Sequence, residues 1–587
     1  MMRQVDKNDS SFSNIEKLNN ELQNVKLDSN PKVSVYFETD SKKMTTSPSL
    51  NNYFGANEQS DNLQVVNFGS TNSSKTSDTV DATATSSSKS EPVVCRIFAE
   101  TPQPKKSVDP TSSFFDTIMQ PDPPSAANSS GFILDMGLNN YNNEESYSGG
   151  HEVNRRRDAW IPSDQTREAL IASATSPPGT YIPNSYQLTM PGVILEDDLN
   201  DMLQEDVTHY LGAAEATQRK ILTADDVTQD DRGLRELIQA NCYRAAVNLT
   251  GRLLKIYGQG VGGLNRPSKH TPHSLQLWFT RIALLVKIKS FSDAEKESEA
   301  FGDLDNPDLY FQFYPDKFGG RPGSIVPFSF RILLAELPMH CGKAKESMNR
   351  LIKILITVRQ ILTNLNNGAT EDGNPMELSE TDRNESIQLW TDRQRRVQHS
   401  IVNCALQQEN YELAIQIVQQ LLTEKDLKIN QQIALHSTLG RILLQVGDIA
   451  RADESFIKAN DLAGNVTDVR NIVDRSLVEI AKNNFSEAYQ ILVQGNQIDP
   501  ANIMILNNMA VCLLYTGRLK EAISLLENAI NANPTKGLND SLLLNLCTLY
   551  ELESSHSNTK KLNLLRQLAR YKADAGMNVR QCLKLPL

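Results

Sequence analysis

The chain of 587 residues carries a formal net charge of -12 and has an isoelectric point near 5.3. An acidic chain lacks the basic face that the phosphates of a nucleic acid require, so we expect no nucleic-acid partner. Its first twenty residues are polar, and no apolar run approaches the roughly 18 residues of a membrane span. We therefore expect neither a secretory signal nor an integral membrane segment.

Residues 1–150 are rich in Ser, Thr and Asn and include a low-complexity stretch at 70–90. Such a composition cannot bury enough apolar surface to offset the conformational entropy of the chain, so it predicts a disordered N-terminal arm. Small apolar islands interrupt the arm, among them Phe114-Phe115-Asp116. A solvated apolar island in a linker is the commoner meaning of such a segment, and a short docking motif is the alternative.

Residues 151–230 form a partly ordered, acidic linker with short helices. Ser163 is a plausible N-cap for a short helix at 166–172, and a proline-rich extended stretch follows at 177–191. The acidic segment 196–206 favours a solvated helix face over an acidic docking peptide.

Helical periodicity dominates from residue 231 onward. Apolar residues recur at spacings of three and four, and breaks fall at clusters of Gly, Pro and Asn. We expect degenerate helical repeats at 231–363, a loop insertion at 364–379, and regular repeats with C-terminal capping helices at 380–587.

The last repeats follow a fixed grid of small residues. Ala510, Ala522, Ala529 and Pro534 are spaced 12, 7 and 5 residues apart, and Gly517 lies at the turn between the two helices. This is the tetratricopeptide pattern, in which small residues stand where two antiparallel helices approach closely. The grid recurs upstream, at Gly440, Gly447, Ala452, Phe456 and Ala459, then at Phe485, Ala488, Leu492 and Pro500. Ala488 and Ala522 are 34 residues apart, which is the period of this repeat.

A weaker form of the pattern occurs earlier, with Trp278, Leu285, Phe291 and Ala294 at the aromatic, Leu, aromatic and Ala positions. Stacked helix pairs bury one continuous core, and their ends need a cap with a polar outer face. We expect residues 541–552 and 560–571 to form that closing pair. The predicted fold is an all-α, tetratricopeptide-like helical solenoid whose surface binds segments of other proteins.

The residue types and their spacing favour no catalytic, cofactor or metal site. Gly258, Gly260 and Gly263 satisfy GxGxxG, but a helix precedes them and Pro267 follows, so we interpret them as a helix C-cap and loop. His270 belongs to an HxxH segment that has no acidic or Cys partner nearby. The seven cysteines lack CxxC pairs, as is typical of reduced, mostly buried thiols in the cytosol. We expect no catalytic residues, no cofactor and no metal.

One ligand class of such repeats, the acidic tails of chaperones, is also disfavoured. Asn508 stands at one position of the clamp that holds such tails. The other clamp positions hold apolar residues, namely Val473, Leu477, Leu538 and Leu542. We therefore expect no co-chaperone clamp.

Several segments resemble one family, the twelfth subunit of the TRAPP (trafficking protein particle) membrane-tethering complex. They are residues 158–163 (DAWIPS), 222–225 (LTAD) with 232–235 (RGLR), 245–254 (AAVNLTGRLL), 307–310 (PDLY) with 323–329 (GSIVPFS), 507–515 (NNMAVCLLY), and 549–554 (LYELES) with 581–585 (QCLKL). The resemblance covers residues 155–587.

The resemblance implies a non-catalytic scaffold subunit of a TRAPP III-like vesicle-tethering and Rab-exchange complex, acting in endoplasmic reticulum-to-Golgi transport and autophagy. It implies other TRAPP subunits as partners, particularly the eighth and eleventh, together with vesicle coat proteins. It also implies a cytoplasmic protein that is peripheral at the endoplasmic reticulum–Golgi intermediate compartment and the Golgi. The alternative is a tetratricopeptide adaptor in mitotic chromosome or kinase signalling, for which Ser176-Pro177 and Thr271-Pro272 are among the candidate phosphorylation sites.

Within the arm, Phe114-Phe115-Asp116 also resembles a two-phenylalanine motif in an acidic tract, of the kind that endoplasmic-reticulum receptors with the major-sperm-protein fold bind. The tract departs from that motif, because Ser113 and Met119 stand where it has acidic residues. Phosphorylation at Thr111, Ser112 or Ser113 would supply the missing charge.

Overall fold

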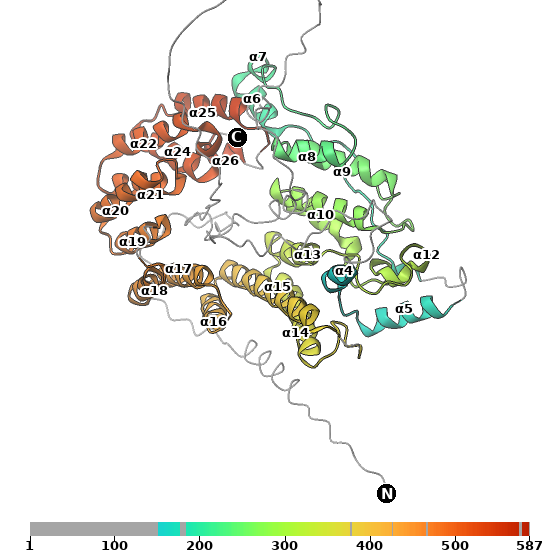
Figure 1. Cartoon of the computed structure of the whole chain (residues 1–587). Helices are drawn as coiled ribbons and strands as arrows, with labels where there is room; N and C mark the ends of the chain where they lie inside the picture. The colour runs from blue at the N-terminus through green and yellow to red at the C-terminus, as the bar shows by residue number, and fades with distance from the viewer. Residues whose placement is uncertain are drawn as a thin grey trace, which may run out of the picture. The chain divides into compact units, whose positions relative to one another are not determined.

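A computed structural model describes residues 151–176, 184–375, 378–424, 426–464, 468–574 and 578–585 (Figure 1). The arm at 1–150, with Phe114, Phe115 and Asp116, lies outside the described residues. The described chain is all-α, and its extended segments make only isolated β-bridges.

In the described part of the linker that precedes the repeats, the chain forms four α-helices and one 3-10 turn. They are α4 (His151–Asp158), α5 (Asp164–Thr175), η3 (Ser185–Gln187), α6 (Met202–Leu211) and α7 (Ala213–Ala216). The predicted helix after Ser163 is confirmed as α5, and the Ser163 hydroxyl caps it by accepting from the Thr166 amide at 3.4 Å. The solvated helix face predicted at 196–206 is only partly right, since Glu196, Asp197, Asp198 and Glu205 are exposed. The helix begins only at Met202, and the Asp206 side chain is buried against Arg580, which donates at 2.6 Å.

The chain then forms helix pairs. The first three are α8 (Asp231–Gln239) with α9 (Tyr243–Ile256), α10 (Pro272–Lys287) with α11 (Phe291–Ser298), and α13 (Phe328–His340) with α14 (Ala344–Asn366). Between α11 and α13 lie η4 (Glu299–Phe301), η5 (Pro307–Leu309), η6 (Phe311–Phe313) and α12 (Pro315–Phe318).

The later pairs are α15 (Glu380–Gln407) with α16 (Tyr411–Leu422), α17 (Ile429–Val446) with α18 (Ile449–Ala463), α19 (Val469–Ala481) with α20 (Phe485–Ile498), and α21 (Ile503–Tyr515) with α22 (Leu519–Ala532). After α23 (Pro534–Gly537), α24 (Asp540–Glu553) and α25 (Asn558–Tyr571) stand where the closing pair is expected, and α26 (Val579–Cys582) follows. Each of the pairs from α15 to α22 packs on the next in chain order (Figure 1).

One turn recurs in every pair up to α22. The residue between the two helices has a left-handed backbone, at Asn241, Lys289, Gly342, Glu409, Gly447, Asn483 and Gly517, with φ between 58° and 91°. The amide after it donates to the carbonyl five residues back, as Arg518 does to Leu513 and Ser290 to Leu285, at 2.8 and 2.9 Å. This is a Schellman motif, which ends one helix and starts the next. The degenerate upstream segments are therefore built on the same turn as the regular repeats.

The core follows the pairs as consecutive clusters of buried apolar side chains. The first cluster contains the fully buried Trp278, and Trp390 fills a smaller one beside α14. In the segment 364–379, Glu371 is buried and accepts from the Ser386 hydroxyl at 2.7 Å. No helix among the described residues is both long and apolar enough to cross a bilayer.

Candidate functional surfaces

The repeat-defining small residues lie at close helix contacts. Ala294, Ala452, Ala488 and Ala522 have no exposed surface, and Ala510 and Ala459 are buried. A Cβ added at Gly440 would lie 2.4 Å from the Phe456 ring, so α17 and α18 approach closely only because this residue is glycine.

The remaining grid residues mark turns. Ala529 is half-buried near the end of α22, and Pro534 opens α23 just after that helix. Pro500 is exposed in the connection between α20 and α21. The grid thus identifies helix contacts and boundaries, and it supplies no reactive group.

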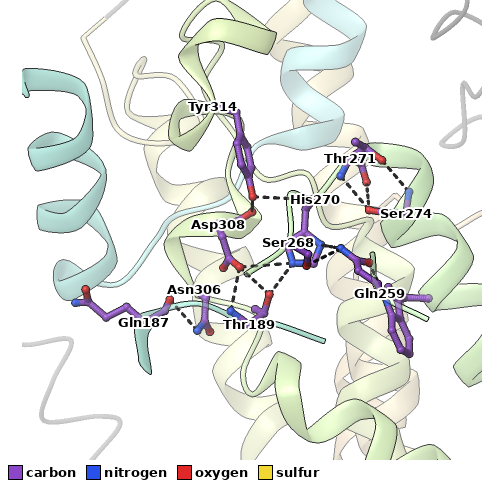
Figure 2. A network of polar contacts seen from close by, with 11 residues as sticks. Gln187, Thr189, Gln259, Ser268, His270, Thr271, Ser274, Asn306, Asp308 and Tyr314 are labelled. Carbon is purple, nitrogen blue, oxygen red and sulfur yellow. Dashed lines mark hydrogen bonds and ion pairs between the residues drawn. The ribbon is translucent and has the colours of Figure 1, made fainter. Parts of the chain in front are cut away.

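A buried polar network joins the linker to the first helix pairs (Figure 2). The Thr189 hydroxyl donates to Asp308 Oδ2 at 2.7 Å, and its oxygen lies 2.6 Å from His270 Nε2. The Thr189 amide also donates to Asp308 Oδ2, at 2.9 Å. On the far side of the ring, the Gln259 amide nitrogen lies 3.4 Å from His270 Nδ1. Trp278 Nε1 donates to Gln259 Oε1 at 2.8 Å, which fixes the orientation of the amide.

These bonds assign the proton positions in the network. Because the Thr189 hydroxyl gives its proton to Asp308, it accepts from His270 Nε2, and Nδ1 accepts from the Gln259 amide. A nucleophilic hydroxyl needs the opposite arrangement, in which the imidazole takes the hydroxyl proton. Thr189, His270 and Asp308 are at most 4% exposed, so solvent and substrate are also kept out. The network therefore anchors the linker and does not act as a catalytic triad.

Sequence reasoning singled out His270 but missed Thr189 and Asp308 as its partners, because they stand 119 residues apart in the chain. The two histidines of the HxxH segment have separate surroundings. His273 Nε2 contacts Asp231 at 2.8 Å, and its Nδ1 lies 2.7 Å from the Tyr257 hydroxyl. The interpretation of the GxGxxG segment as a helix C-cap and loop is confirmed, because α9 ends at Ile256 directly before it.

An extended segment of the linker, residues 187–199 (the strap), runs across the first two helix pairs. The Val193 amide donates to the carbonyl of Gln259 at 3.1 Å. Asn248 of α9 clamps the main chain of Leu199, accepting from its amide at 2.9 Å and donating to its carbonyl at 3.1 Å. Each end of the strap is thus fixed by polar side chains of the repeat region.

The middle of the strap lies on a buried ion pair. The Arg281 guanidinium donates to both oxygens of the Glu297 carboxylate, at 2.6 and 2.8 Å, and both side chains are almost fully buried. The Ile194 amide donates to the same carboxylate at 3.2 Å. Such a pair is well satisfied, and removing one partner would leave a buried charge.

The resemblance segments 158–163 and 323–329 meet in the structure. The Asp158 carbonyl accepts from the Ser324 amide at 2.8 Å, and a Cβ on Gly323 would come within 2.7 Å of that carbonyl. The Arg331 guanidinium lies 4.1 Å from the centre of a Trp160 ring. The residues of these segments hold the end of α4 and its connection to α5 against α13 and the residues before it, which is a structural role.

The positions of a co-chaperone clamp are closed. Val473, Leu477, Leu538 and Leu542 are buried in the core, and Asn508 is 7% exposed. The described cysteines are free thiols, and only Cys341 is not fully buried. Burial raises the pKa of Cys512 to about 11 and that of Cys547 to about 12, so neither is a thiolate nucleophile at neutral pH.

Comparison with known proteins gives the following findings. The family model of the tetratricopeptide repeat matches residues 479–549. The mouse protein named trafficking protein particle complex subunit 12 is 42% identical over 438 residues, which are 74% of this chain and 54% of that protein. Its human counterpart is 40% identical over 438 residues, covering 74% of this chain and 59% of that protein. The chain therefore spans just over half the length of the curated relatives that it matches.

Among solved structures, a tetratricopeptide repeat protein from Parabacteroides merdae is similar at 15% identity. The match covers 53% of this chain and 98% of that one, with a TM-score of 0.30.

Proposed function

Because this chain is a homologue of the proteins named trafficking protein particle complex subunit 12, we propose that it is a non-catalytic scaffold subunit of a TRAPP complex. The observation that carries the proposal is the 42% identity over 438 residues. The more specific proposal is a TRAPP III-like assembly that tethers vesicles and promotes Rab nucleotide exchange in endoplasmic reticulum-to-Golgi transport and autophagy.

The non-catalytic role is supported by what the polar clusters do. The Thr189, His270 and Asp308 network and the Arg281–Glu297 pair are buried, and their side chains bond to one another within the fold. The repeat architecture supports a scaffold, since stacked helix pairs offer extended surfaces for segments of other proteins. Exchange chemistry is accordingly assigned to other subunits.

The proposed partners are other TRAPP subunits, the eighth and eleventh first, and coat proteins of vesicles. The proposed location is cytoplasmic and peripheral at the intermediate compartment and the Golgi. The test is co-expression of the full chain with tagged eighth or eleventh subunit, followed by capture on the tag and size-exclusion chromatography. We expect a stoichiometric complex with at least one of them, and elution of this chain as a separate species from both would overturn the partner assignment.

A further inference from the structure

The charge of this acidic chain is unevenly distributed around the turn between α9 and α10. Residues 237–292 contain eight Lys and Arg residues and no Asp or Glu, whereas the whole chain has a net charge of -12. Four of the eight are held in ion pairs: Arg244, Arg252, Arg281 and Lys289. Lys287 is half-buried in α10. The other three, Lys255, Arg266 and Lys269, are exposed, and none of them has an ion-pair partner within 4.0 Å among the described residues. These three cations flank one loop, residues 255–269.

Glycines fold this loop tightly onto the end of α9. Gly258 and Gly262 have left-handed backbones with φ of 73°. A Cβ on Gly260 would lie 2.9 Å from the Cα of Lys255, and a Cβ on Gly263 would lie 2.6 Å from the Gly258 carbonyl. On its other side the loop is held by the strap, since the Asn265 amide donates to the carbonyl of Met190 at 3.1 Å. The loop therefore has a fixed shape before any partner binds.

The same loop exposes large apolar side chains. Ile256, Val261 and Leu264 are 76%, 54% and 41% exposed. Apolar side chains on a glycine-rich loop, flanked by unpaired cations, have the composition that settles at the boundary between lipid headgroups and acyl chains. Three acidic residues of the adjoining segments have partners outside the loop: Asp198 and Asp225 both pair with Arg252, and Asp231 contacts His273.

We propose that the loop at 255–269 is a contact site for an anionic lipid surface. Ile256, Val261 and Leu264 enter the headgroup region, and Lys255, Arg266 and Lys269 lie against anionic headgroups. The charge complementarity selects the occupant, because the loop presents three cations without ion-pair partners on a chain whose net charge of -12 is repelled by such a surface. This contact goes beyond the proposed scaffold role and depends on no other subunit.

The test is flotation of the full-length chain with phosphatidylcholine vesicles, with and without phosphatidylserine. We expect binding only to the vesicles that contain phosphatidylserine, and weaker binding as salt is raised. The triple variant Lys255→Gln/Arg266→Gln/Lys269→Gln should bind about a hundredfold more weakly, since each cation near such a surface contributes a factor of about five. The double variant Val261→Ser/Leu264→Ser should also lose binding. All of these side chains are exposed, so melting temperatures should match wild type.

The matched control is Ile457→Ser/Leu462→Ser, which removes two comparably exposed apolar side chains from α18. It should bind vesicles as wild type does. The proposal is overturned if the wild-type chain does not float with phosphatidylserine vesicles, or if the loop variants float as well as the control.

Discussion

The Arg219 guanidinium donates a hydrogen bond of 2.6 Å to the carbonyl of Lys572, which lies 353 residues later in the chain. It also donates to the carbonyl of Ala569 at 2.8 Å, and its Nε lies 2.5 Å from the Asp201 carboxylate. Leu203, Val207 and Ala216 pack into the same apolar cluster as α24 and α25. The closing pair is therefore covered by the linker that precedes the first pair, where the sequence predicts a polar outer face.

This relationship makes Arg219 a sensitive position for stability. Its side chain is 1% exposed and that of Asp201 is 7% exposed. We expect Arg219→Met to lower the free energy of unfolding by about 3–5 kcal/mol, because it leaves a buried carboxylate without its partner. The control is Arg566→Met, whose pair with Glu215 is about half exposed and should contribute no more than about 1 kcal/mol. Equal losses in denaturant melts of the two variants would contradict this account.

The helix contacts in the regular repeats give a second expectation. Ala522 is fully buried within the cluster shared by α21, α22 and α24. Ala522→Leu should overpack that contact and cost about 1–3 kcal/mol of stability. Ala532→Leu, at the exposed end of the same helix, is the matched control. If thermal melts of both variants coincided with wild type, the assignment of the repeat frame would be wrong.

The pH dependence of stability should have a contribution from His436. Burial, reinforced by the Lys458 ammonium, lowers the pKa of this imidazole below 6.5 in the folded chain. The unfolded chain therefore binds a proton as the pH falls through about 6.5 while the folded chain does not, so this contribution to stability is lost toward acid. We expect His436→Gln to reduce the slope of the unfolding free energy between about pH 7 and pH 5. An unchanged slope would show that the group titrates alike in both states.

We expect the two hydrogen bonds between the Asn248 side chain and the main chain of Leu199 to hold the strap in place. Asn248→Ala removes two hydrogen bonds from the main chain of Leu199. At about 1 kcal/mol for each bond, hydrogen exchange of the amides around Leu199 should accelerate at least about tenfold. Asn563→Ala, an exposed change on α25, is the control and should leave that exchange unchanged. A strap that exchanges at the wild-type rate in both variants would mean that other contacts hold it.

How much of the fold the sequence predicts differs along the chain. The helix pairs from α17 to α22 could be predicted from the sequence because Gly440, Ala488 and Ala522 must be small where helices touch. Of the earlier pairs, α13 and α14 have a glycine at this left-handed turn, Gly342, whereas the other three have Asn241, Lys289 and Glu409 there, so no glycine marks their turns. The spacing of apolar residues reveals the helix period, whereas a turn that is fixed by tertiary packing requires no particular residue type and so cannot be recognised in the sequence.

The polar sites were harder to predict from the sequence than the fold. Thr189 and Asp308 bind each other although they lie 119 residues apart in the chain. The strap shows no helical periodicity because it is extended and lies across the first two helix pairs. The resemblance segments 158–163 and 323–329 were visible in the sequence, but only the structure shows that Asp158 and Ser324 bind each other.

The central proposal is that this chain is a TRAPP subunit that does no exchange chemistry of its own. The most direct measurement is affinity purification of the full-length chain, with mass spectrometry of what accompanies it and a Rab nucleotide-exchange assay on the same sample. We expect several TRAPP subunits to be recovered, with exchange activity in the assembly and none in the isolated chain. Recovery without TRAPP subunits, or exchange by the isolated chain, would contradict the claim.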